Sequence, residues 1–252
     1  MSQYIGYICK ENTASPVGSL CVDGVRNLRL LSWVRPGPAG SGCKISLETR
    51  MRIAVFGATG RLGRAAVQAA LQPGHVVTAH SRKARPEAQP GVEWVTGDIG
   101  NAVTEAEVVL VTFGPRSPSD LPFCSKETQA ILDSMQRLGV QRILCVTGAI
   151  VGDYPGNRTW CFQHFARWIQ KRYQEIMDDR ARQEALIRSS GMKWTVFKPP
   201  RLTMKSPAGN VVAGPAVRVG LLSSVSRCSL ARLMVQEAES GRFVGQTVFV
   251  KG

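Results

Sequence analysis

From residue 51 onward, short β-branched apolar runs alternate with segments of helical periodicity. Such alternation is typical of a parallel sheet covered by helices. We predict strands at 52–56, 75–80, 92–96, 107–113, 141–147, 193–197 and 246–250, and helices at 61–72, 124–138, 160–190 and 228–239. Only about ten residues separate the third strand from the fourth, so any helix there should be short or absent. The predicted fold class is α/β, with a Rossmann-type doubly wound, mostly parallel sheet and helices on both faces.

Residues 1–50 show neither helical periodicity nor alternation, and they include a Gly- and Pro-rich stretch at 36–42. We therefore predict two regions: a poorly structured, flexible N-terminal extension at 1–50 and a folded domain at 51–252. Because Met51 directly precedes the first predicted strand, we also raise the hypothesis that the natural start site is Met51, which leaves the role of residues 1–50 open.

Lys and Arg outnumber Asp and Glu by 32 to 18, giving a net charge of +14 that favours anionic ligands. We find no long basic run and no basic stripe interleaved with aromatics, so we do not expect nucleic acid as a partner. The apolar runs are too short for a transmembrane helix, and no membrane partner is expected. Seven irregularly spaced cysteines without a Cys-x-x-Cys pair predict a reducing, cytoplasmic compartment and no metal site.

A glycine-rich turn lies between the first predicted strand and helix, where a dinucleotide-binding turn must lie. It reads Gly57-Ala58-Thr59-Gly60-Arg61-Leu62-Gly63. Gly57 permits the tight turn, Gly60 lets the backbone approach a pyrophosphate, and Gly63 allows close packing of the helix. The Thr59 hydroxyl and the free N–H groups of the helix add hydrogen bonds. The alternative is that the glycines merely serve the turn, but the strand and helix on either side favour nucleotide binding.

The second predicted strand ends at Ser81, Arg82 and Lys83, where a site selective for NAD normally carries an acid. No acid is present. Arg82, with Lys83 as a second charge and Ser81 as a neutral donor, suits the 2′-phosphate of NADPH. The alternative is an ordinary solvated basic turn.

Later strand ends should line the same crevice, because ligands of open α/β sheets lie beyond the carboxyl ends of the strands. Asp98 and Ile99 are therefore expected near the adenine. Phe113 and Gly114, together with Thr147 and Gly148, are expected near the ribose and nicotinamide. Each of these could also be a plain loop residue.

These residues, and the run from Asp178 through Ser190-Gly191 to Lys198-Pro199-Pro200-Arg201-Leu202, resemble the atypical short-chain dehydrogenase/reductases with an NAD(P)H-binding domain. Within that group the chain is similar to the biliverdin reductase B and flavin reductase-like proteins of the NmrA-like superfamily. The resemblance covers residues 51–252. It implies that Arg116 contacts the central ribose region together with Phe113 and Gly114, and that Thr147 and the Pro199-Pro200 loop border the nicotinamide.

The chain departs from that group at two positions. Gly148 stands where its reductases usually carry serine, and Arg201 where they carry histidine; no Tyr-x-x-x-Lys pair is present either. Tyr154 as a proton donor and Arg201 as a substrate-binding cation are weak candidates for catalysis. Trp160, His164 and Trp168 share one helical face, which we expect to be packed core, with a pocket wall or partner surface as the alternative.

The resulting prediction is a cytoplasmic NADPH-dependent reductase, a monomer or homodimer, that transfers hydride to a conjugated small-molecule acceptor such as a flavin, quinone or tetrapyrrole. The alternative is a non-catalytic regulatory protein of the NmrA-like type that senses NADP(H).

Overall fold

The computed structural model of the chain describes residues 50–82, 89–115, 121–204 and 210–252. Internal contacts divide the chain into two units, residues 1–47 and 48–252, and every described residue belongs to the second unit. Apart from Arg50, the predicted N-terminal extension therefore lies outside the described residues.

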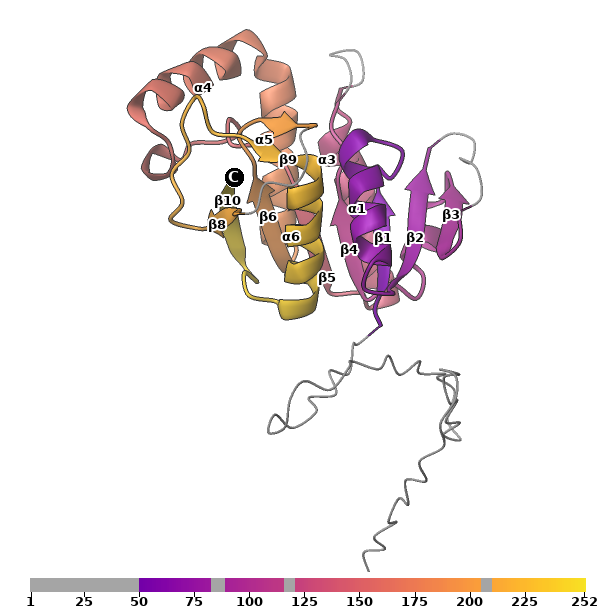
Figure 1. The fold of residues 1–252 in the computed structure, drawn as a ribbon. Helices are drawn as coiled ribbons and strands as arrows, with labels where there is room; N and C mark the ends of the chain where they lie inside the picture. The colour runs from indigo at the N-terminus through magenta and orange to yellow at the C-terminus, as the bar shows by residue number, and fades with distance from the viewer. Residues whose placement is uncertain (1–49, 83–88, 116–120, 205–209) are drawn as a thin grey trace, which may run out of the picture. The chain divides into compact units, whose positions relative to one another are not determined.

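Eight strands form one sheet in the order β3-β2-β1-β4-β5-β6-β10-β8 (Figure 1). Its strands are β1 (Arg52–Phe56), β2 (Val76–Ser81), β3 (Val92–Thr96), β4 (Val108–Val111), β5 (Arg142–Val146), β6 (Lys193–Lys198), β8 (Val212–Gly214) and β10 (Gln246–Lys251). Neighbouring strands are parallel except for β8, which pairs antiparallel with β10. The direction in which the strands are added reverses between β1 and β4, and a crevice at that switch point is the usual ligand position in such sheets.

Helices cover both faces of the sheet, which confirms the predicted fold class. They are α1 (Arg61–Leu71), α2 (Ile99–Val103), α3 (Cys124–Leu138), α4 (Trp160–Arg172), α5 (Gln174–Ser189) and α6 (Arg227–Ser240). Helices α1 and α6 pack together on one face, and α2, α3 and α5 form a layer on the other. As expected, the helix between β3 and β4 is short, with five residues.

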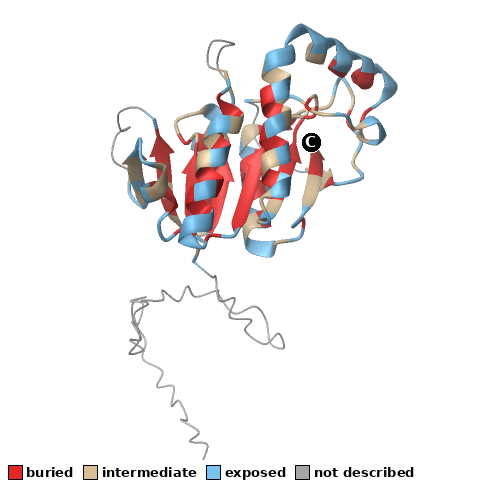
Figure 2. Cartoon of the chain, turned by 180° about the vertical axis from the view of Figure 1, so that it is seen from behind, coloured by how far each residue is buried: buried red, intermediate tan, exposed pale blue. Residues whose placement is uncertain are grey.

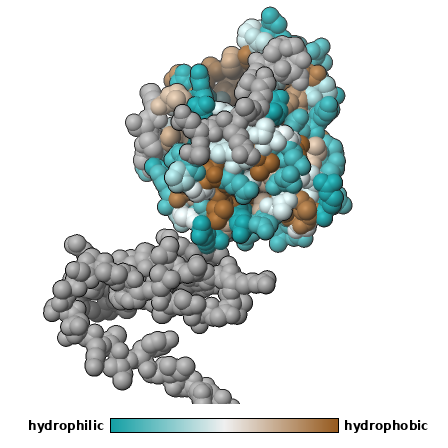
Figure 3. Space-filling model, turned by 90° about the vertical axis from the view of Figure 1, so that its right-hand side faces the viewer, coloured by the Kyte–Doolittle hydropathy of each residue, from teal (hydrophilic) through white to brown (hydrophobic). Residues whose placement is uncertain are grey.

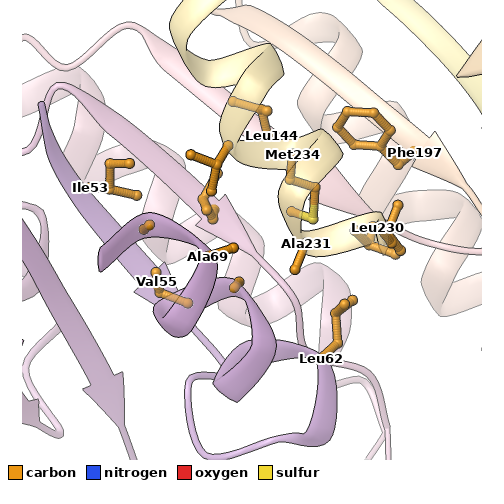
Figure 4. Packing of buried hydrophobic residues seen from close by; sticks show 14 of the residues in the cluster. Ile53, Val55, Leu62, Ala69, Leu144, Phe197, Leu230, Ala231 and Met234 are labelled. Carbon is orange, nitrogen blue, oxygen red and sulfur yellow. The ribbon is translucent and has the colours of Figure 1, made fainter. Parts of the chain in front are cut away.

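The core consists of two layers because successive side chains of a strand point to opposite faces. On β1, Ile53 and Val55 pack toward α1 and α6, whereas Ala54 and Phe56 pack toward the other layer. Figure 4 shows the first layer, where Met234 of α6 lies among side chains from both strands and helices. The central strands are buried on both faces, and the edge strand β3 is only partly buried (Figure 2). Because the central strands are buried on both faces, their sequences are continuous apolar runs.

Two details differ from the sequence prediction. The single helix predicted at 160–190 is wrong: Tyr173, at φ −126° and ψ 45°, separates α4 from α5. Tyr173 is neither glycine nor proline, so the sequence contains no signal for the break. The structure also has short strands that were not predicted, namely β7 (Leu202–Thr203), β8 and β9 (Val225–Ser226). Segments of two or three residues are too short for a periodicity to identify.

Trp160, His164 and Trp168 share an exposed face of α4, so the expectation that this face is packed core is wrong. Trp160 is 73% exposed and Trp168 is 60% exposed, while Phe162 and Ala166 are buried. Periodicity correctly groups residues that share a face, but it does not identify which face packs against the domain.

Candidate functional site

The turn after β1 is built around glycines that leave no room for side chains. Gly57 has φ +80°, and a Cβ added there would lie 2.9 Å from the backbone N of Phe113. Only glycine adopts this left-handed backbone readily, and only glycine allows so close an approach to the end of β4. The turn therefore lies directly beside the segment that follows β4.

Gly63 lets α1 begin in contact with that turn. A Cβ at Gly63 would lie 2.1 Å from the carbonyl O of Gly57 and 2.7 Å from the Cα of Ala58. Both neighbours are backbone atoms, which cannot move aside as a flexible side chain can. Every larger residue would push α1 away from the turn.

The N-terminus of α1 is suited to an anion. Gly60 is the N-cap, no side chain caps the helix, and its first turn contains no acid. The first-turn N–H groups therefore keep their hydrogen-bonding capacity, and the positive end of the helix dipole lies beside them. Together with the space left by the three glycines, this arrangement fits a diphosphate.

The other residues of the turn divide into core and surface. Ala58 and Leu62 are buried and belong to the core, so only their backbone is available to a ligand. Thr59 is half-buried and Arg61 is exposed. Of the non-glycine side chains of the turn, Thr59 and Arg61 are thus the ones that can contact a bound nucleotide.

Arg82, at the end of β2, is exposed, and its guanidinium carbon lies 4.3 Å from the centroid of the Phe123 ring. Such stacking holds a guanidinium in place while leaving its N–H groups free to meet a phosphate. Ser81 is buried, and its carbonyl accepts a hydrogen bond of 2.9 Å from the Gly97 N–H. Lys83 lies outside the described residues.

At the end of β3, Asp98 is the N-cap of α2, and its Oδ1 accepts a hydrogen bond of 3.1 Å from the Asn101 N–H. Ile99 is half-buried and packs against the core. Both residues lie at the carboxyl edge of the sheet, where the sequence analysis places them. The Oδ1 atom of Asp98 is already engaged in the hydrogen bond that caps α2.

The ends of β4 and β5 are joined by a residue that the sequence analysis missed, Arg180 of α5. Its Nη1 donates to the Phe113 carbonyl at 3.1 Å, and its Nη2 donates to the carbonyls of Val146, at 3.2 Å, and Thr147. A Cβ at Gly114 would lie 3.0 Å from the same guanidinium. Arg180 therefore holds two predicted segments of the site together. Arg116, predicted to lie beside them, is outside the described part of the chain.

Asp179, the preceding residue, is fully buried and caps α3 from α5. Its carboxylate accepts hydrogen bonds from the N–H groups of Phe123, Cys124 and Ser125 at 3.2, 2.7 and 3.0 Å, and from the Ser125 hydroxyl at 2.5 Å. Burial alone would raise the pKa of Asp179, but these hydrogen bonds outweigh burial and lower it. Because Phe123 supports Arg82, this cap also helps to position the basic end of β2.

A buried ionic cluster lies behind the ends of β5 and β6. Glu184 of α5 accepts hydrogen bonds from Thr147 Oγ1 at 2.6 Å and from Lys198 Nζ at 2.5 Å. Lys198 also donates to the Val151 carbonyl at 2.9 Å. Burial lowers the pKa of Lys198 to about 8, although Glu184 opposes that shift. The cluster thus contains an ammonium group that gives up its proton more readily than an exposed lysine.

Tyr154, one of the two weak catalytic candidates, belongs to this cluster. Its hydroxyl donates to Glu184 Oε2 at 3.3 Å and accepts a hydrogen bond from Arg188. Lys198 Nζ lies 4.5 Å from the centroid of its ring. Tyr154 is half-buried, so one side remains accessible. The structure therefore places a tyrosine and a lysine around one carboxylate, although they are far apart in sequence.

The remaining predicted residues lie beside the cluster. The carbonyl of Pro199 accepts a hydrogen bond of 2.9 Å from the Ala149 N–H, and the carbonyl of Gly148 accepts one of 3.3 Å from Lys198. Pro200 is half-buried. Arg201 is exposed, and its side chain makes no hydrogen bond or ion pair with any described residue. The Pro199-Pro200 loop is thus attached to the segment after β5, and Arg201 is held only through its backbone.

Sequence reasoning missed the polar face of α5. Its buried residues, spaced as one helical face, are Asp179, Arg180, Gln183, Glu184 and Ile187. Four of these five are polar where a packed helix normally presents apolar side chains. The lack of an apolar stripe in this helix was the signal in the sequence for a buried polar network. Buried charges persist only when they are paired or hydrogen-bonded.

Comparison with known proteins agrees with this geometry. A family described as NAD(P)H-binding matches residues 57–240. ChuY, an anaerobillin reductase from Escherichia coli O157:H7, has a TM-score of 0.67 and 18% identity, covering 79% of this chain and 96% of that one. A candidate NADH-flavin reductase from Streptococcus pneumoniae TIGR4 has a TM-score of 0.62 and 22% identity, covering 80% and 99%.

A third solved structure is a short-chain dehydrogenase/reductase of the wide type from Veillonella parvula, in complex with NADP. Its TM-score is 0.65 at 16% identity, and the alignment covers 81% of this chain and 95% of that one. At such identities the likeness establishes a shared fold. In the described part of this chain, no helix is both long and apolar enough to cross a bilayer.

Proposed function

Because the chain belongs to the NAD(P)H-binding family, we propose that it is an NADPH-dependent reductase that passes hydride to a conjugated acceptor such as a flavin, a quinone or a tetrapyrrole. The observation that carries the proposal is the glycine turn, in which Gly63 has no room for a Cβ and the start of α1 has no acid or side-chain cap. The reductase names of two structural relatives support the reaction class.

The preference for NADPH rests on Arg82. Its guanidinium is supported by Phe123 and remains exposed at the strand end where the ribose of a dinucleotide normally binds. A planar guanidinium can donate two parallel hydrogen bonds to a phosphate. No carboxylate occupies residues 80–83, where one would repel that phosphate.

The proton chemistry is assigned to the cluster around Glu184. When bound, the nicotinamide supplies a hydride, and the acceptor that takes it gains a negative charge. Tyr154 donates its hydroxyl proton to that acceptor, and Arg188 stabilises the phenolate that remains. Tyr154, which is half-buried, then regains its proton from water on its accessible side, while the Lys198–Glu184 pair holds the phenol in place from behind.

The first experiment tests cofactor choice by titration calorimetry with NADPH and NADH. We expect Arg82→Glu to weaken NADPH binding by about 1.5–3 kcal/mol, because a charge-assisted hydrogen bond is lost, and to change NADH binding little. Arg242→Glu is the matched control, since Arg242 is also exposed and stacks on a phenylalanine, Phe243, at 5.1 Å. Equal losses for both nucleotides would place the 2′-phosphate elsewhere.

The second experiment tests turnover, by following NADPH absorbance with a panel of flavins, quinones and tetrapyrroles. With an accepted substrate, Tyr154→Phe should lower kcat by about 10²-fold while the Kd for NADPH stays the same, because only the proton donor is removed. An unchanged kcat would show that water supplies the proton.

The second candidate function is a regulatory protein that senses NADP(H) without turnover. Gly148, and an Arg201 whose side chain has no partner among the described residues, favour it, because they replace the serine and histidine usual in the related reductases. Tight NADPH binding without oxidation by any member of the panel would establish this alternative.

We further propose a cytoplasmic monomer or homodimer. The four cysteines in the described ranges are free, which supports a reducing compartment. Size-exclusion chromatography with light scattering measures the oligomeric state directly.

A further inference from the structure

Helix α4 presents an unusual outer surface. Trp160, Phe165 and Trp168 are 73%, 41% and 60% exposed, while the opposite side of the helix packs into the domain through Phe162 and Ala166. Large aromatic side chains this exposed remain in contact with water at a considerable cost in free energy. Their concentration on one short helix points to a surface that is covered when the protein functions.

Two exposed leucines extend this surface at the start of α4. Leu221 and Leu222 are 51% and 94% exposed. The segment before them is joined to the residues preceding α4, since the Val219 carbonyl accepts a hydrogen bond of 3.0 Å from the Thr159 N–H. Figure 1 shows this orange segment beside the beginning of α4. We call Trp160, Phe165, Trp168, Leu221 and Leu222 the α4 surface.

The side of the molecule that carries β3 provides a contrast. There, apolar residues form small areas separated by hydrophilic ones (Figure 3). Single exposed apolar residues are ordinary on a protein surface, whereas a cluster is a sign of an interaction site. The α4 surface is such a cluster.

The charged side chains of α4 itself are all basic. Arg167, Lys171 and Arg172 are exposed on α4, and residues 160–172 contain no Asp or Glu. Arg218, just before the two leucines, is exposed as well. A helix that combines exposed tryptophan with arginine and lysine has the composition of helices that lie in the interface of anionic membranes.

Other occupants fit this surface less well. A second copy would bring the same cations face to face, and like charges across an interface oppose association. Helix α4 does interleave cations with aromatic residues, contrary to the sequence expectation, so single-stranded nucleic acid could stack on its tryptophans; its planar bases, however, give no role to the exposed leucines. An acyl-chain boundary accepts both the aromatic and the aliphatic side chains, and anionic headgroups match the cations.

We propose that the α4 surface docks the protein onto an anionic lipid bilayer, with Trp160, Trp168 and Leu222 in the headgroup region and Arg167 and Lys171 against lipid phosphates. Such docking is peripheral and needs no spanning helix. It revises the sequence expectation that no membrane is involved, which rested on the absence of a long apolar run. The proposal is independent of the reductase chemistry.

The experiment is co-sedimentation of the full chain with vesicles of phosphatidylcholine alone or mixed with phosphatidylglycerol. We expect binding to the mixed vesicles only, weakened by added salt. Replacing Arg167, Lys171 and Arg172 by glutamine should reduce binding about fivefold per cation. A matched control replaces Lys193, Arg232 and Arg242, which are exposed on other elements, so that the same net charge is lost elsewhere.

The apolar part is tested with Trp160→Ser combined with Trp168→Ser, which should reduce vesicle binding by more than about tenfold. Thermal melting and NADPH binding should not change, because both side chains are on the surface. Vesicle binding equal to that of the unaltered protein in both α4 variants would overturn the proposal. So would light scattering that shows a dimer lost in the tryptophan variant, or RNA binding lost in the same variant at physiological salt.

Discussion

At the scale of single residues, the proposed nucleotide site depends on glycines at positions that have no room for a side chain. The turn between β1 and α1 has no space at Gly63, because the carbonyl of Gly57 would lie 2.1 Å from any Cβ. A methyl group there must displace the start of α1, and the helix N–H groups would move with it. Binding and stability are therefore linked at this position.

We expect Gly63→Ala to abolish detectable NADPH binding and to lower the free energy of unfolding by about 1–3 kcal/mol through overpacking. Calorimetry and urea denaturation measure the two effects. Gly156→Ala is the control, because no atom lies within 4 Å of a Cβ at that position. Nucleotide affinity retained in Gly63→Ala would contradict the role assigned to the turn.

Lys198 makes stability depend on pH. Its pKa falls from 10.5 to about 8 on folding, chiefly because it is buried. Between these two pH values the unfolded chain binds more protons than the folded one, so the free energy of unfolding rises with pH across this window. Relative to Lys198→Met, the unaltered protein should gain up to about 3 kcal/mol from pH 8 to 10.5. A difference between the two proteins that is constant over this window would contradict the assignment.

At the scale of elements, α5 makes hydrogen bonds to α3 and to the carboxyl ends of three neighbouring strands, β4, β5 and β6. Asp179 caps α3, Arg180 bonds to carbonyls that follow β4 and β5, and Glu184 pairs with Lys198 of β6. A helix normally contributes an apolar stripe, but the buried face of α5 contributes mostly hydrogen bonds and charge. Side chains of this one helix thus stabilise the carboxyl ends of β4, β5 and β6.

The helix cap yields a prediction at this scale. Asp179→Ala should lower the free energy of unfolding by about 2–4 kcal/mol, because the cap is lost and three N–H groups lose a buried acceptor. Asp133→Ala, an exposed aspartate of α3, should change it by less than about 0.5 kcal/mol. Since the pKa of Asp179 is lowered on folding, its contribution is present at neutral pH and is lost only in acid. Equal effects of the two substitutions in urea denaturation would contradict the assignment.

For the whole molecule, features that depend on residues close together in sequence could be predicted, and features that depend on distant residues could not. The longer strands, most covering helices and the glycine turn were predictable because neighbouring residues determine them; the break between α4 and α5 and the short strands β7, β8 and β9 were not. The cluster around Glu184 was not, because Thr147 and Glu184 are 37 positions apart and come together only through the sheet. The exposed face of α4 was misjudged for the same reason, since Trp160 and Phe162 differ only in what the rest of the domain covers.

The arrangement of α5 affects how variants of this protein should be interpreted. A change at Asp179, Arg180 or Glu184 would disturb the strand ends and the basic turn together, although none of these side chains is predicted to touch a nucleotide. A genetic screen for loss of the protein's function would therefore recover substitutions in this helix alongside those in the glycine turn. Inherited or engineered changes there belong among the suspected loss-of-function alleles even where the altered side chain contacts no nucleotide.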